Sequence, residues 1–123
     1  MISVEFNNKT EILNVRVEGD ITLEEIVDFM IVIENNEVYP RKLKVLMDAR
    51  KASVKFKING LSKIVKGNNR SLKNYNCFTE AIVLTTPKET ALAMFYALIS
   101  KTKNYKFKVF STTESALYWL ENY

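Results

Sequence analysis

The stretch Phe78–Ala91, FTEAIVLTTPKETA, contains a strand that runs directly into a helix. Residues 78–85 are mostly apolar and rich in strand formers, which predicts a buried strand. Thr86 can cap the following helix, Pro87 suits its first position, and Glu89 completes a capping box. A strand followed directly by a helix is typical of α/β proteins with a parallel sheet.

Further strands and helices are predicted on both sides of this stretch. We predict strands at 2–6, 12–17, 43–48, 78–85 and 107–110, and helices at 22–33, 61–75, 86–99 and 111–120. Capping boxes from Thr22 to Glu25 and from Ser111 to Glu114 mark the starts of the first and last helices. Residues 67–69, Gly-Asn-Asn, weaken the middle of the helix at 61–75, and residues 49–57 give no clear pattern. Strands that are separated by helices pair in parallel, whereas the first two, joined by an Asn-rich turn, form an antiparallel hairpin. The prediction is an α/β fold of order β-β-α-β-α-β-α-β-α, with a mostly parallel five-stranded sheet and an antiparallel N-terminal edge strand.

Length and composition indicate one domain over residues 1–123. Leu, Ile, Val and Phe make up 39 of the 123 residues, well above the level typical of disordered chains. The N-terminus lacks a basic segment followed by a long apolar run, so we expect no secretory signal. One free cysteine, Cys77, suits a reducing compartment, and we therefore expect a cytoplasmic protein.

The chain lacks the residue types on which much catalysis depends. It has no histidine and a single cysteine, which removes the commonest general base, Cys–His nucleophiles and cysteine zinc clusters. Neither the P-loop motif GxxxxGK[ST] nor the dinucleotide-binding motif GxGxxG occurs in the sequence. We therefore expect no enzyme, no metal and no cofactor.

Four stretches, taken in order, resemble a known family. They are 17–22 (VEGDIT), 43–48 (LKVLMD), 81–87 (AIVLTTP) and 107–117 (FKVFSTTESAL). Their order is similar to that of the STAS-like, SpoIIAA-like domains, which include anti-sigma-factor antagonists and short related bacterial proteins. The resemblance implies a non-catalytic bacterial regulatory module that binds a partner protein. Lipid-carrying domains of the Sec14 type are similar in their β-α superhelix, and that analogy admits an apolar ligand.

The phosphorylation motif of the antagonists is incomplete in this sequence. In that family a Ser in an Asp-Ser-Ser-Gly-Leu-like motif opens the helix after the third strand. The best match is residues 57–61, KINGL, in which only the final Gly-Leu pair agrees and Ile58 stands in place of the acceptor Ser. The resemblance therefore implies a member without the usual phospho-acceptor; Ser53 and Ser62 are the nearby hydroxyls.

Charge is distributed unevenly along the chain. Residues 1–40 carry two basic and nine acidic side chains, a net charge of −7, whereas residues 41–73 carry eleven basic and one acidic, a net charge of +10. At about 100° per residue, Lys63, Lys66 and Arg70 fall on one side of the helix predicted at 61–75. This face and the loop 49–60 are candidates for binding a protein partner with an acidic surface, an anionic lipid or a small anion. The alternatives are a solvated surface, or pairing with the acidic first helix within the monomer or across a homodimer. Nucleic acid is not an expected partner.

The carboxyl edge of the predicted sheet offers a second group of candidates. Asp48 is expected to end the third strand there, and helix N-termini at this edge favour anions. The candidate partner- or anion-binding residues are Asp48, Arg50, Lys51, Ser53, Asn59, Gly60, Lys63, Lys66, Arg70 and Thr86. The alternative is that several of them are ordinary helix caps.

The first helix is apolar on all sides. Phe29, Met30, Ile31 and Val32 are consecutive, so one face cannot hold them all. They are a candidate apolar interface or the wall of an apolar pocket. The alternative is burial between the helices predicted at 61–75 and 111–120.

Overall fold

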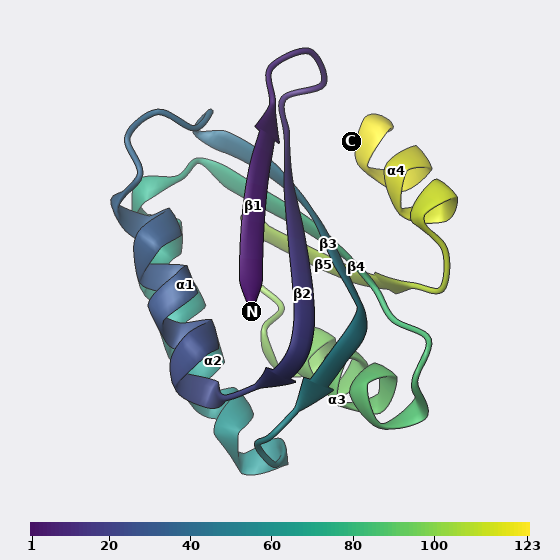
Figure 1. Ribbon diagram of the computed structural model, residues 1–123. Helices are drawn as coiled ribbons and strands as arrows, with labels where there is room; N and C mark the ends of the chain where they lie inside the picture. Colours follow the sequence, from purple (N-terminus) through teal and green to yellow (C-terminus); the bar gives the residue numbers. More distant parts are fainter.

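The computed structural model describes residues 1–123 as one sheet with helices on both faces (Figure 1). The strands are β1 (Ile2–Asn7), β2 (Ile12–Ile21), β3 (Lys42–Val54), β4 (Cys77–Val83) and β5 (Tyr105–Phe110). The helices are α1 (Leu23–Asn35), α2 (Leu61–Ser71), α3 (Pro87–Ile99) and α4 (Thr113–Glu121), and short 3-10 helices at Ile58–Gly60 and Leu72–Asn74 flank α2.

The strands lie in the sheet in their sequence order, β1-β2-β3-β4-β5. β1 pairs antiparallel with β2, and the other three neighbouring pairs are parallel. This confirms the predicted α/β order, including the antiparallel edge strand at the N-terminus.

The sheet separates two hydrophobic cores. α1 and α2 lie side by side on one face, which α3 also covers, and α4 lies on the opposite face (Figure 1). β4 supplies both cores, because Phe78 and Ile82 face the three-helix side while Ala81 and Val83 pack against α4. The alternative that the first helix is buried between the second and last helices is therefore wrong, since the sheet lies between α1 and α4.

The third strand continues well beyond Asp48, where the sequence pattern predicted its end. Residues 51–54 pair with Glu18–Ile21 of β2, after an irregularity at which Ala49 and Arg50 stand opposite Val17 alone. Such a bulge shifts the alternation of side chains by one residue. Ala49 and Ala52 consequently both face the three-helix core, and the period-two pattern that would have revealed the strand is lost.

Side-chain caps fix the first residue of two helices. Thr22 and Glu25 form the predicted capping box at α1, with the Glu25 amide donating to Thr22 Oγ1 at 3.2 Å. The box predicted from Ser111 and Glu114 is wrong by one position. Thr112 is the N-cap of α4, and its hydroxyl accepts from the Ser115 amide at 3.2 Å.

The start of α3 holds the end of β3. Thr86 is the N-cap and Pro87 opens the helix as predicted, but the Thr86 hydroxyl donates to Glu89 Oε1 at 2.7 Å and caps no amide. The other carboxylate oxygen of Glu89 accepts from the Val54 amide at 3.1 Å, and Lys88 Nζ donates to the Val54 carbonyl at 2.8 Å. β4 pairs with β3 only as far as Asp48. Side chains of α3 therefore supply hydrogen bonds to the end of β3 that β4 does not supply.

Candidate functional site

An apolar cavity of about 160 Å³ lies between the sheet and the helices α1, α2 and α3. Its lining is almost entirely hydrophobic. The helices contribute Ile26, Phe29, Met30, Ile33, Leu61, Ile64, Asn68, Glu89, Leu92, Ala93 and Tyr96. The strands and the segments after β3 and β4 contribute Ile2, Val17, Ile21, Met47, Ala49, Ala52, Val54, Phe56, Phe78, Glu80, Ile82, Leu84 and Phe107. We call this space the apolar cavity.

Small side chains leave this space open. Ala49 and Ala52 of β3 and Ala93 of α3 are all buried and all line the apolar cavity. The bulge in β3 brings the first two to the same face of the sheet. Protein interiors contain few voids larger than a water molecule. An apolar space of about 160 Å³ that opens to solvent beside this core is therefore a candidate ligand site.

Glu80 of β4 places a carboxyl group in the apolar cavity. The Tyr105 hydroxyl donates to Glu80 Oε1 at 2.7 Å, and the Tyr96 hydroxyl donates to the Tyr105 oxygen at 3.2 Å. Burial raises the pKa of Glu80 to about 7, although the hydrogen bond from Tyr105 acts in the opposite direction. Glu80 can therefore change its charge near neutral pH.

Two further polar side chains line the apolar cavity. Glu89 is buried, and its hydrogen bonds from Thr86 and Val54 use both of its carboxylate oxygens. Burial acts to raise the pKa of Glu89, but these hydrogen bonds outweigh it and hold the pKa below its usual range. Asn68 of α2 is 4% exposed, and its Nδ2 has no hydrogen-bond partner. A ligand that accepts a hydrogen bond could satisfy this donor.

The four apolar candidates of α1 divide into two pairs. Phe29 and Met30 line the apolar cavity. Ile31 and Val32 point away from it and are 37% and 61% exposed. The helix is thus apolar on all sides because its inner face forms a cavity wall while part of its outer face remains uncovered.

The basic candidates of α2 lie outside the apolar cavity. Lys63 and Lys66 are exposed and have no carboxylate oxygen within 4.0 Å. Arg70 Nε lies 2.6 Å from Glu34 Oε1 of α1. One member of the basic face is therefore paired with the acidic first helix within the monomer, which was among the predicted alternatives.

Asp48 lies inside β3, just before the bulge, and not at the end of the strand. Arg50 lies in the bulge, and Lys51 and Ser53 follow it. Asp48 points to the α4 side of the sheet, where Arg50 Nη2 approaches its Oδ2 to 2.8 Å. This contact with Arg50 lowers the pKa of Asp48. Arg50 and Lys51 line a shallow polar hollow with Asp48, while Ser53 is half-buried further along the strand.

The remaining candidates lie at the starts of two helices. Asn59 and Gly60 form the 3-10 turn before α2, and Thr86 caps α3 through its bond to Glu89. The candidate anion-binding residues are thus distributed over β3, α2 and α3, with the acidic partners Asp48 and Glu34 already bound to Arg50 and Arg70.

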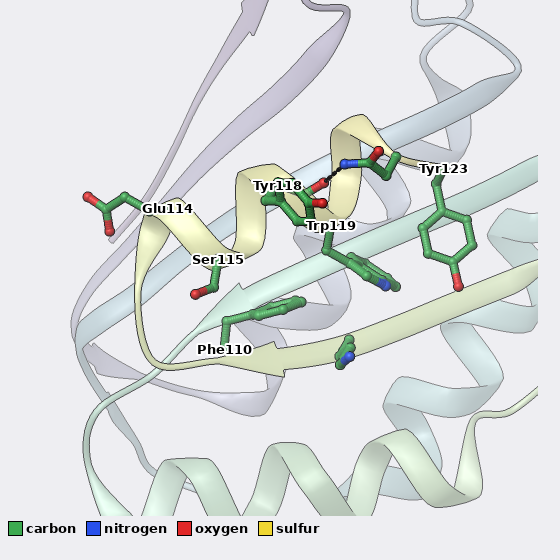
Figure 2. A pocket seen from close by; sticks show the side chains of 8 residues that line it. Phe110, Glu114, Ser115, Tyr118, Trp119 and Tyr123 are labelled. Carbon is green, nitrogen blue, oxygen red and sulfur yellow. Dashed lines mark hydrogen bonds between the residues drawn. The ribbon is translucent and has the colours of Figure 1, made fainter.

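A second hollow lies on the other face, between β5 and α4 (Figure 2). Figure 2 shows Phe110 of β5 beside Trp119 of α4, with Tyr123 at the end of the chain. The ring centroids of Phe110 and Trp119 are 5.6 Å apart, and those of Trp119 and Tyr123 are 4.8 Å apart. This hollow is a surface groove whose aromatic side chains pack on one another, and Lys106 lies 4.2 Å from the centre of the Tyr123 ring.

Sequence reasoning missed the polar side chains of the cavity, Glu80, Asn68 and Tyr96. The signal for Glu80 was present, since it alternates with Phe78 and Ile82 on the buried face of a central strand. An acidic residue on such a face is rarely left there without a partner. Asn68 had no comparable signal, because the Gly-Asn-Asn sequence indicated only a weak point in the helix.

Comparison of the structure with solved structures identifies the fold. No family model matches the chain, and no curated protein matches its sequence. An uncharacterised DUF3478-family protein with a SpoIIAA-like fold from Shewanella loihica matches with a TM-score of 0.64 and 17% identity, over 98% of this chain and 92% of that one. The Bacillus cell fate determinant SpoIIAA, in its phosphorylated form, matches with a TM-score of 0.57 and 13% identity, over 97% of this chain and 98% of that one. The chain therefore has a SpoIIAA-like fold, as the sequence resemblance implied.

Proposed function

We propose that this chain is a non-catalytic regulatory domain that binds a small apolar molecule in the cavity between its sheet and the helices α1, α2 and α3. The apolar cavity carries the proposal, because its 160 Å³ is lined almost entirely by hydrophobic side chains and lies beside α1. Pockets for drug-sized ligands measure about 300–1,000 Å³, whereas a cavity of about 150 Å³ holds benzene. The expected ligand is therefore about the size of one ring, or is the end of a longer chain.

A non-catalytic role is supported by the chemistry of the lining. The apolar cavity contains two carboxyl groups, Glu80 and Glu89, and no lysine, arginine, serine or cysteine. Glu89 is fully engaged by Thr86 and Val54, which leaves no nucleophile and base in contact. The exposed Ile58 begins the turn before α2 and has no hydroxyl group, which supports a domain that does not use the phosphorylation switch of the antagonists.

Toluene binding tests the proposal. In an NMR titration followed at the Met30 methyl group, we expect saturable shifts with the wild-type chain. Ala93→Leu fills the apolar cavity and should remove these shifts. Ala91→Leu makes the same change at an exposed position of α3 and should leave them intact. Absence of saturable binding to the wild type, or equal binding by the Ala93 variant, contradicts the proposal.

Binding of an acidic protein surface is the second candidate, which we propose for the outer face of α2. It is favoured by Lys63 and Lys66, which are exposed and have no acidic partner in the monomer. Partner side chains with carboxylates would complement this face.

Poly-glutamate provides the probe for this second candidate. The double variant Lys63→Glu, Lys66→Glu should bind poly-glutamate more weakly than the wild type at low salt. The control is Lys101→Glu, Lys103→Glu, which changes the net charge by the same amount. We expect the loss of affinity in the first variant to exceed that in the control by at least about tenfold. Equal weakening by the two pairs would mean that net charge alone attracts the probe. Binding to phosphatidylserine vesicles in place of poly-glutamate would point to a membrane surface.

A further inference from the structure

Glu80 is a carboxyl group that the fold leaves with a single hydrogen bond. Tyr105 donates to its Oε1 at 2.7 Å, and no other hydrogen bond reaches the side chain. No lysine or arginine nitrogen lies within 4.0 Å of it. Glu80 is half-buried among apolar side chains. Carboxylates that are largely removed from water are normally paired with a cation or bound by several donors, and Glu80 has only the one donor.

The groups that surround Glu80 do not supply this partner. Tyr105 of β5 and Tyr96 of α3 are neutral hydroxyls, and burial raises the pKa of Tyr96 further above its usual value. Glu89 of α3 is acidic and bound elsewhere, and Asn68 of α2 is uncharged. α1 presents only Ile26, Phe29, Met30 and Ile33 to the apolar cavity. No cation therefore faces Glu80 from any element around the cavity.

We propose that the preferred ligand of the apolar cavity is a small apolar primary amine, bound as an ammonium ion whose N–H groups donate to the Glu80 carboxylate. This inference rests on the proposed function, since it requires that the apolar cavity admits a ligand. The hydrocarbon part of the amine lies against the hydrophobic walls, and Tyr105 holds the carboxylate in place from behind. The ligand thus brings the missing positive charge.

The charge state of Glu80 makes this binding dependent on pH. An ammonium ion pairs with ionised Glu80 and gains little from the neutral acid. Because burial raises the pKa of Glu80 to about 7, the ionised fraction falls about tenfold between pH 8 and pH 6, and amine affinity falls by the same factor. Toluene has no group that titrates or pairs, so its affinity should stay constant over this range.

Benzylamine, benzyl alcohol and toluene test the inference as probes of similar shape. At pH 8 we expect Glu80→Gln to weaken benzylamine binding by at least about tenfold while toluene binding changes less than twofold. Glu114→Gln removes an exposed carboxylate on α4 and should change neither affinity. Tyr105→Phe removes the bond that stabilises the ionised form, so the midpoint of the benzylamine pH profile should move to higher pH.

The outcomes separate this inference from the proposed function. Saturable toluene binding combined with benzylamine affinity that is independent of pH, or that survives Glu80→Gln, overturns the amine inference alone. Benzyl alcohol binding more tightly than benzylamine at pH 8 also overturns it and indicates a neutral hydroxyl ligand. Failure of all three probes to bind the wild type overturns both. The wild-type pH profile needs no substitution, so the inference stays testable if the Glu80 variant fails to fold.

Discussion

Glu80 and Glu89 are two carboxyl groups in the same cavity whose surroundings move their pKa values in opposite directions. Glu89 accepts hydrogen bonds on both oxygens, from Thr86 and Val54, and its pKa is held below the usual value. Glu80 accepts one bond, from Tyr105, and burial raises its pKa to about 7. Burial is the largest influence on both groups, but at Glu89 the hydrogen bonds and the nearby charge of Lys88 outweigh it, whereas at Glu80 the single bond does not. Glu89 therefore fastens β3 to α3, whereas Glu80 is free to respond to pH and to a ligand.

The raised pKa of Glu80 predicts a loss of stability as pH rises. Its pKa is about 7 in the folded chain and near 4.5 when unfolded, so folding retains a proton between these values. Stability from this group is fully present below pH 4.5 and is lost as pH rises through 7. The shift corresponds to about 3 kcal/mol at most. We expect the free energy of unfolding of the wild type, compared with that of Glu80→Gln, to fall by up to this amount between pH 4.5 and pH 8.

Urea denaturation of both chains at a series of pH values measures this difference, and Glu114→Gln serves as the exposed control. A difference between wild type and Glu80→Gln that does not change with pH would mean that the Glu80 carboxyl is as well solvated in the folded chain as in the unfolded one.

At the level of the elements, local sequence signals were sufficient where a few neighbouring residues decide the structure. The Thr22–Glu25 capping box started α1, and Pro87 opened α3, as predicted. Alternating or continuous apolar runs located the five strands, and the helices between strands β2 to β5 indicated their parallel pairing. These signals depend on contacts within four or five residues, which the sequence displays directly.

Structure that depends on distant residues was not predicted. The continuation of β3 to Val54 is held by β2 and by Glu89 and Lys88 of α3, and the bulge at Ala49 hides the alternation. The continuity of α2 through Gly67 was similarly obscured. Gly67 is buried where α2 packs against Met30 of α1, and a Cβ added there would lie 3.4 Å from the end of that side chain, an ordinary contact distance. Close packing between helices compensates for its poor helix propensity.

The candidate site was predicted only in part, for the same reason. Phe29 and Met30 could be selected because an all-apolar helix needs something to cover it, and both line the apolar cavity. The emptiness of the cavity depends on Ala49, Ala52 and Ala93, which come from elements far apart in the sequence. A single sequence does not reveal which of its alanines will face one another across a core.

In the whole molecule, the sheet divides the interior into two parts with different tasks. The side covered by α1, α2 and α3 contains the apolar cavity, with its small residues and its titratable carboxyl group. The side covered by α4 is a compact cluster in which Ala116 and Leu120 are completely buried against β3 and β4. We expect the α4 side to stabilise the fold without influencing the ligand, because no residue of α4 lines the apolar cavity.

Leu120→Ala tests this division of the molecule. The substitution removes a fully buried side chain, and we expect it to lower the free energy of unfolding by about 2–5 kcal/mol. In the fraction that remains folded, toluene affinity measured at the Met30 methyl group should change by less than about twofold, because separated sites contribute independently.

Ile64→Ala is the matched control on the other face. It truncates a buried side chain that lines the apolar cavity, so it should lower stability and alter toluene affinity together. A large loss of toluene affinity in Leu120→Ala would show that the sheet transmits packing changes from one face to the other, and the two cores would then have to be treated as one unit.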